Sequence, residues 1–196
     1  SLNSWDCGDN TTDSCFLSES HECEWDGVGC NSNNEVTGLH LDKRNLTGVL
    51  PKLDGFEHLV ELDMDSNQIG GSLPELAKLK YLEIVDLDQN KLSGTIPIPP
   101  PSLRVLDVND NHLTGTVPAE LADTNLYFLQ LDFNDLVGGI PSRLALLDSL
   151  EYMSIFGNSF TEALAIDFCE SQLTMLFADC DMCVNAVCCT ACWAEE

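Results

Sequence analysis

Cationic residues are scarce in this chain of 196 residues, which has 8 lysines and arginines against 33 aspartates and glutamates. The formal net charge of −25 leaves no cationic footprint for phosphate groups, so nucleic-acid binding is excluded and anionic membrane surfaces are disfavoured. No apolar run approaches the roughly 18 residues of a membrane-spanning helix. Hydrophobic residues nevertheless make up 44% of the chain, so it can bury a core.

Cysteine is absent between Cys30 and Cys169, although the chain has ten. Four lie near the start and six near the end: Cys7, Cys15, Cys23, Cys30, Cys169, Cys180, Cys183, Cys188, Cys189 and Cys192. Two even-numbered groups around a cysteine-free middle predict disulfide-stapled ends, and therefore a secreted protein or one in a secretory-route lumen. We expect Cys23 to pair with Cys30, whereas the pairing of the last six stays open.

Zinc binding is the alternative for the two Cys-x-x-Cys pairs, Cys180–Cys183 and Cys189–Cys192. Only five residues separate these pairs, whereas zinc-ribbon spacings leave about 15–20. Disulfides are therefore the favoured interpretation.

A secretory route is also indicated by two Asn-x-Thr sequons, which make Asn10 and Asn45 candidate glycosylation sites. The sequence starts without an initiator Met or a signal peptide. We therefore expect that a leader was removed or lies outside this sequence.

The middle of the chain repeats the pattern Leu-x-Leu-x-x-Asn-x-Leu-x-Gly-x-Ile-Pro from residue 36 onward. The Asn recurs at intervals of 23, 21, 23 and 24 residues, at Asn67, Asn90, Asn111, Asn134 and Asn158. Arg44 takes its place in an earlier copy, which makes six copies. Each copy predicts a short strand with inward aliphatic and outward spacer residues, and stacked copies bury a continuous apolar column. We expect each Asn amide to point inward and to bond backbone groups of neighbouring coils.

Together with this repeat, the segment Cys23-Glu-Trp25-Asp-Gly27-Val28-Gly-Cys30 resembles plant-type extracellular leucine-rich-repeat proteins, such as receptor-kinase ectodomains and polygalacturonase-inhibiting proteins. Trp5 stands where the N-terminal cap of that family usually has an upstream Trp. The last six cysteines are more similar to the ends of secreted leucine-rich-repeat proteins from diatom-like algae. The resemblance implies a non-catalytic module, since family members bind peptides, cell-wall enzymes or co-receptor ectodomains.

The predicted fold is an α/β repeat solenoid, a right-handed leucine-rich-repeat superhelix with disulfide caps at both ends. A short parallel sheet lines the concave face, and the convex side is mostly irregular or 3-10 helical. We expect an N-terminal cysteine cap at residues 1–35, six repeats at 36–165 and a C-terminal cysteine-rich cap at 166–196. Gly and Pro of each repeat are expected to turn the chain across the back.

Aspartates dominate the outward columns of the predicted concave face. One column has Asp63, Asp86 and Asp107, and the next has Asp65, Asp88 and Asp132. Rungs lie about 4.8 Å apart, so neighbouring carboxylates repel by about 3–4 kcal/mol at an effective dielectric constant of 20. The columns should therefore bind cations, have raised carboxyl pKa values, or be screened by water and salt.

Three interpretations of this acidic surface stay open: a solvated face that aids solubility, a binding face for a basic partner, and a calcium site. Asp63, Asp65, Asp86 and Asp88 are the calcium candidates, although they are weak ones. Calcium takes six to eight oxygen ligands, and carboxylates carried on strands converge poorly.

Aromatic residues gather in the late repeats of the same face, at Phe128, Phe133, Tyr152 and Phe156. Clustered exposed aromatics are enriched at interfaces and sugar-stacking sites, so these four are the favoured anchor for a protein or glycan partner. Phe133, near the turn, could instead belong to the core. The four histidines share no face, and no catalytic, phosphate-binding or dinucleotide-binding motif is present.

The predicted function is non-catalytic extracellular recognition of a protein or glycan on the acidic and aromatic concave face, with a basic partner among the candidates. No cofactor is expected apart from calcium at the weak candidates. The alternative is a structural or adhesive component of an extracellular matrix or larger assembly, organised by cations.

Overall fold

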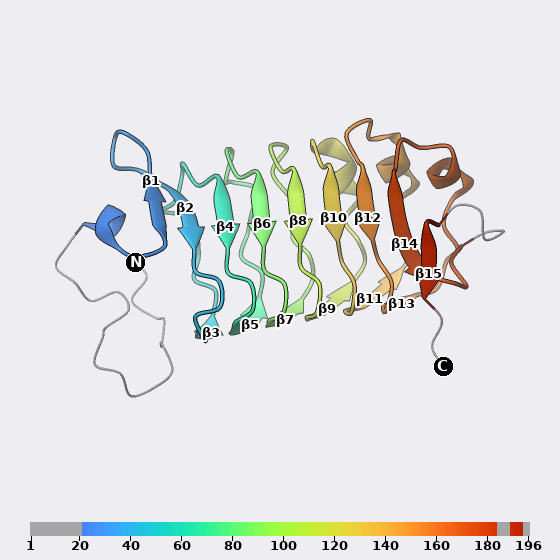
Figure 1. The fold of residues 1–196 in the computed structure, drawn as a ribbon, viewed down its shortest axis with the longest axis horizontal. Helices are drawn as coiled ribbons and strands as arrows, with labels where there is room; N and C mark the ends of the chain where they lie inside the picture. Colours follow the sequence, from blue (N-terminus) through green and yellow to red (C-terminus); the bar gives the residue numbers. More distant parts are fainter. Residues whose placement is uncertain (1–20, 184–188, 194–196) are drawn as a thin grey trace.

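The computed structural model describes residues 21–183 and 189–193. In this part of the chain, successive turns stack side by side into an elongated repeat solenoid (Figure 1), which confirms the predicted fold class. Cys7, Cys15, Cys188, Trp5 and the sequon at Asn10 lie outside the described residues.

A nine-stranded sheet runs along the concave face (Figure 1). In spatial order its strands are β1 (Val28–Cys30), β2 (Val36–His40), β4 (Glu61–Asp63), β6 (Ile84–Asp86), β8 (Val105–Asp107), β10 (Phe128–Gln130), β12 (Tyr152–Ser154), β14 (Met175–Asp179) and β15 (Ala191–Trp193). Only β1 is antiparallel to its neighbour among these pairs. The register places Asp63 beside Asp86 and Asp86 beside Asp107, so the predicted alignment of these residues is confirmed.

A second sheet of six parallel strands lies across the back, where the sequence predicted only turns. Its strands are β3 (Thr47–Val49), β5 (Gln68–Ser72), β7 (Lys91–Gly94), β9 (His112–Gly115), β11 (Asp135–Gly138) and β13 (Ser159–Phe160). Each takes in residues between the positions of the repeat's Asn and Pro, because stacking at a fixed period brings these extended segments into hydrogen-bonding register. β7 ends on Gly94, whose φ of +78° is a left-handed conformation that favours glycine and redirects the chain.

The convex side has short 3-10 helices, as predicted. In the later turns these are η2 (Ala119–Asp123), η3 (Ser142–Leu146) and η4 (Ile166–Cys169), and a further 3-10 helix of the described residues, η1 (Glu22–Glu24), precedes β1. Leu121 and Leu144 of η2 and η3 are fully buried, so these helices close the apolar column from behind.

The repeat asparagines form the inward ladder that the sequence predicted. Asn111 is typical: its Oδ1 accepts a 2.8 Å hydrogen bond from the Leu92 backbone, and its Nδ2 donates to the carbonyls of Leu87, Val108 and Asn109 at 3.0–3.2 Å. The side chain is only 5% exposed. The ladder therefore satisfies backbone groups between neighbouring turns that would otherwise be buried without partners.

Disulfides lie near both ends of the described chain. Cys23 pairs with Cys30, as predicted, and the C-terminal bonds are Cys180–Cys192 and Cys183–Cys189. Each C-terminal bond links one Cys-x-x-Cys pair to the other, so the zinc alternative is wrong for these four cysteines. Cys169 is also disulfide-bonded, and none of the cysteines in the described residues is free.

Candidate functional site

Alternation along the strands decides which side chains reach the concave surface. In β4, β6, β8 and β10 the central residue is buried and its two neighbours are partly exposed. The partly exposed positions form two columns that follow the register, one starting at Glu61 and the other at Asp63. A third column follows the strand ends, because the amide of Ser66 donates to the Asp88 carbonyl and that of Gln89 donates to the Asn109 carbonyl.

Asp63, Asp86 and Asp107 each support the backbone just after their own strand. Their Oδ1 atoms accept hydrogen bonds of 3.4, 3.4 and 3.2 Å from the amides two residues on, those of Asp65, Asp88 and Asn109. This geometry is that of a local Asx-type turn. The aspartate column therefore shapes the strand ends as well as carrying charge.

Burial, together with the crowding of these carboxylates, raises their pKa values, which is one of the three outcomes that the sequence predicted. Burial and then the neighbouring Asp107 raise the pKa of Asp86 to about 7. Burial and then Asp107 and Asp65 raise the pKa of Asp88 to about 6. Burial also raises the pKa of Asp63 and of Asp107. Asp86 and Asp88 therefore gain their charge close to neutral pH.

A lysine side chain contacts the acidic surface at its N-terminal end, where Lys43 Nζ lies 3.1 Å from the Asp65 carboxylate. One carboxylate oxygen each of Asp63, Asp65 and Asp86 lie within 4.8 Å of one another, whereas Asp88 is not part of that group. Three such ligands are fewer than calcium requires. The geometry brings together three of the four calcium candidates without forming a complete coordination shell from them.

Asp132 was predicted on the exposed surface, and this prediction was wrong: the residue is only 2% exposed. Its Oδ1 accepts a 2.7 Å hydrogen bond from Ser154 Oγ, and Ser154 is also buried. Burial raises the pKa of Asp132 to about 7, against the lowering effect of hydrogen bonds from Ser154 and the Phe156 backbone. The column neighbour of Asp132 is Phe156, a large ring where earlier turns have Asp or Asn, so less water reaches this carboxyl.

The predicted aromatic residues meet in two groups on late strands. Phe128 and Tyr152 stack with their ring centroids 4.5 Å apart and their planes 7° apart. Phe133 and Phe156 meet edge to face at 5.0 Å. Phe133 is 48% exposed, so its alternative assignment to the core is wrong.

Phe177 is an aromatic neighbour that sequence analysis missed. Its ring centroid lies 5.7 Å from that of Tyr152, on β14 in the segment predicted to be a cap. A signal for it existed, because Leu176 follows its register partner Met153 by the repeat interval of 23 residues. We call Phe128, Phe133, Tyr152, Phe156 and Phe177 the aromatic cluster.

The sequon asparagine Asn45 is exposed at a left-handed turn, with φ 56°. Its side-chain oxygen accepts a hydrogen bond from Gln68. The position is accessible to glycosylation, which stays a prediction.

Comparison with protein-family models identifies Leucine Rich Repeat units at residues 58–79 and 102–123. None of the curated protein sequences compared with the chain is similar enough to count as a match. In the described residues, no helix has the length and apolar character needed to cross a bilayer. The relatives found do not support the predicted resemblance of the last six cysteines to algal proteins.

Several solved plant structures are similar to the chain. The ectodomain of GASSHO1/SCHENGEN3 from Arabidopsis thaliana, in complex with CASPARIAN STRIP INTEGRITY FACTOR 2, is 31% identical over 80% of this chain and 20% of that one, with a TM-score of 0.74. A chain of the BIR3–SERK2 complex from Arabidopsis thaliana is 34% identical over 74% of this chain and 81% of that one, with a TM-score of 0.63.

The plant peptide hormone receptor RGFR1, in complex with RGF2, is 30% identical with a TM-score of 0.62, over 68% of this chain and 22% of that one. The chain thus spans about a fifth of the GASSHO1/SCHENGEN3 and RGFR1 chains and most of the chain from the BIR3–SERK2 complex. It belongs to the leucine-rich-repeat family and has the fold of a plant receptor ectodomain.

Proposed function

We propose that the chain is a non-catalytic extracellular recognition module that binds a basic peptide or protein segment on its concave face. The observation that carries the proposal is the parallel stack of Phe128 on Tyr152, continued by Phe177, on a sheet whose earlier strands present aspartates. The stack anchors apolar groups of the partner, and the aspartates select its positive charges.

The stacked rings of Phe128, Tyr152 and Phe177, part of the aromatic cluster, are suited to anchor a partner. Large aromatic side chains contribute most of the binding energy at many interfaces. Phe128, Tyr152 and Phe177 are each partly exposed, so a partner would bury ring surface that water now covers. Their contacts with one another fix the rings before binding, which lowers the entropy lost on association.

The acidic columns suit charge selection because they lie on strands adjacent to the stack. Asp107 of β8 is the direct neighbour of Gln130 of β10, the strand that also carries Phe128. An extended segment lying across β6 to β14 would place basic residues over Asp86 and Asp107, and an apolar residue over the rings. Charges arranged in this way raise association rates and exclude acidic partners.

The related receptors support this assignment by analogy. GASSHO1/SCHENGEN3 and RGFR1 are seen in complex with CASPARIAN STRIP INTEGRITY FACTOR 2 and RGF2, and the BIR3–SERK2 structure is a complex of two proteins. Fold alone does not fix function, so the concave face of this chain has to be tested by its own residues.

The test is selection of binders from a random peptide display library on the immobilised full chain. We expect the selected peptides to combine Lys or Arg with an aromatic or aliphatic residue. The double variant Phe128→Ala/Tyr152→Ala should lose their binding, whereas Tyr81→Ala, an exposed tyrosine away from the concave face, should retain it. Selection of acidic peptides, or full binding by the double variant, would contradict the proposal.

A further inference from the structure

A second candidate site lies at the N-terminal ends of β2, β4 and β6, along the upper edge of the sheet in Figure 1. Two adjoining cavities of about 580 and 560 Å³ open there, and Glu57 and His58 line both of them. We infer that this double cavity binds a neutral oligosaccharide of two or more rings. The inference does not depend on the proposed function of the concave face.

Aromatic rings form the apolar part of the double cavity. Trp25 and Phe56 line the first lobe, and Tyr81 lines the second. His58, between the lobes, stacks on Tyr81 with ring centroids 5.8 Å apart and planes 9° apart, and Tyr81 is 55% exposed. A flat ring pair that faces water offers a surface against which the C–H face of a sugar ring can pack.

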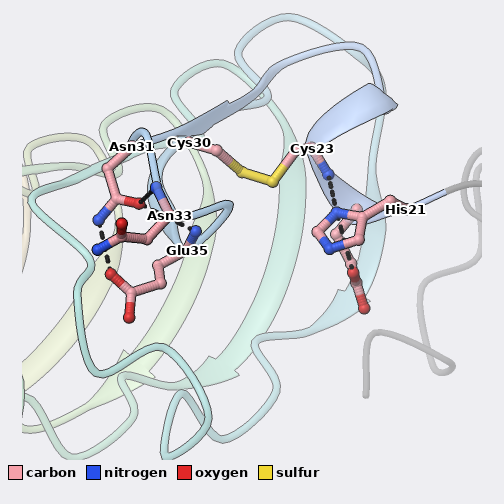
Figure 2. Close-up of a disulfide and its surroundings, with 7 residues drawn as sticks. His21, Cys23, Cys30, Asn31, Asn33 and Glu35 are labelled. Carbon is pink, nitrogen blue, oxygen red and sulfur yellow. Dashed lines mark hydrogen bonds and ion pairs between the residues drawn. A yellow bond between two sulfur atoms is a disulfide. The ribbon is translucent and has the colours of Figure 1, made fainter.

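Polar groups of the first lobe are held in fixed positions. Glu35 Oε2 accepts a 2.7 Å hydrogen bond from Asn31 Nδ2, and Glu35 Oε1 lies 3.1 Å from His58 Nε2. Figure 2 shows the side chain of Glu35 pointing toward that of Asn31, in the loop that follows the Cys23–Cys30 disulfide. The hydrogen bond from Asn31 is the main cause that lowers the pKa of Glu35, so this carboxylate is a ready acceptor for sugar hydroxyls.

Both lobes are lined by donors as well as acceptors of hydrogen bonds. Asn34 and Lys52 accompany Glu35 in the first, while Asp54 and Lys80 line the second. Sugar hydroxyls both donate and accept, so a mixed lining suits them better than a lining of one charge. The chain's net charge of −25 disfavours an anionic sugar, which makes a neutral one the matching ligand.

The size of the site sets the minimum length of the ligand. Each lobe falls within the range of about 300–1,000 Å³ that is common for small-molecule sites. Because the lobes adjoin at Glu57 and His58, one ring in each lobe would be joined by a glycosidic bond near His58. An oligosaccharide therefore fits the site better than a monosaccharide.

The experiment is saturation-transfer NMR with three neutral probes, the hexamers of β-1,4-linked glucose, xylose and mannose, on the full chain. We expect at least one hexamer to bind and its dissociation constant to rise about tenfold or more in Tyr81→Ala and in His58→Ala. Tyr127→Ala is the matched control, because Tyr127 is an exposed tyrosine on the same edge but contacts Arg104 outside the double cavity.

The concave-face double variant Phe128→Ala/Tyr152→Ala should bind the hexamer as the parent does, which separates this site from the peptide site. Absence of binding by all three hexamers would overturn the inference. Equal loss of binding in Tyr81→Ala and Tyr127→Ala, or loss in the concave-face variant alone, would also overturn it.

Discussion

The carboxylate of Asp132 and the hydroxyl of Ser154 are joined by a 2.7 Å hydrogen bond while both side chains are almost fully buried. They lie on neighbouring turns, 22 residues apart in the chain. No described basic residue forms an ion pair with Asp132. The protonation state of Asp132 is therefore linked to the stability of the late turns.

Stability should rise as the pH falls toward 4. The folded chain holds the pKa of Asp132 at about 7, above the ordinary aspartate value of 3.8, so the folded state binds a proton that the unfolded state releases in this window. Raising the pH from about 4 to about 7 therefore costs stability, with a slope of up to about 1.4 kcal/mol per pH unit, and the slope levels off above pH 7. Denaturant unfolding of the parent and of Asp132→Asn across pH 4–8 checks this. The unfolding free energy of the variant should depend less steeply on pH than that of the parent. An equal dependence would show that Asp132 does not cause it.

Affinity for a selected basic peptide should increase from pH 5 to pH 8. Asp86 and Asp88, with pKa values of about 7 and about 6, gain negative charge over this range. We expect roughly a tenfold gain, about 1.4 kcal/mol. Fluorescence anisotropy of the labelled peptide measures the gain, and Asp86→Asn/Asp88→Asn should flatten the profile. A peptide that binds equally well at both pH values would place its charges away from these two residues.

Removal of one ladder asparagine should strongly destabilise the chain. Asn111→Leu leaves the Leu92 amide and the Leu87 carbonyl without their side-chain partner inside the core. We expect a loss of about 3 kcal/mol or more in the free energy of unfolding. Asn125→Ala is the control, because Asn125 is exposed and its side chain donates one hydrogen bond, to the Pro101 carbonyl. That change should cost under about 1 kcal/mol, and equal costs for the two variants would refute the role of the ladder.

Calcium should bind only weakly to the acidic columns. Asp63, Asp65 and Asp86 bring together three carboxylate oxygens, about half of what calcium requires. Isothermal titration should give a millimolar response, and a chelator should leave the melting temperature unchanged. A single micromolar site that Asp63→Asn removes would contradict this expectation.

Periodicity in the sequence was enough to predict the stacking and much of the concave surface. The intervals between Asn67, Asn90 and Asn111 also separate Asp63, Asp86 and Asp107, and the register aligns these aspartates as predicted. The reason is local: a strand alternates its side chains, and a fixed period brings equivalent positions onto adjacent rungs. The Cys23–Cys30 bond was also predicted from the sequence, and the structure confirms it.

Burial and neighbourhood were decided only by the tertiary structure. Asp132 occupies the same column as Asp65 and Asp88, yet it alone is fully buried, because exposure depends on side chains contributed by the next turns. Phe177 joins Tyr152 from a segment that lacks the repeat motif. The double cavity likewise combines residues 22–36 with the two later loops at 52–58 and 78–81. By itself the sequence determined the repeating coil and its columns, because these follow from spacing along the chain. Contacts between turns then determined which polar groups lose water and where cavities remain.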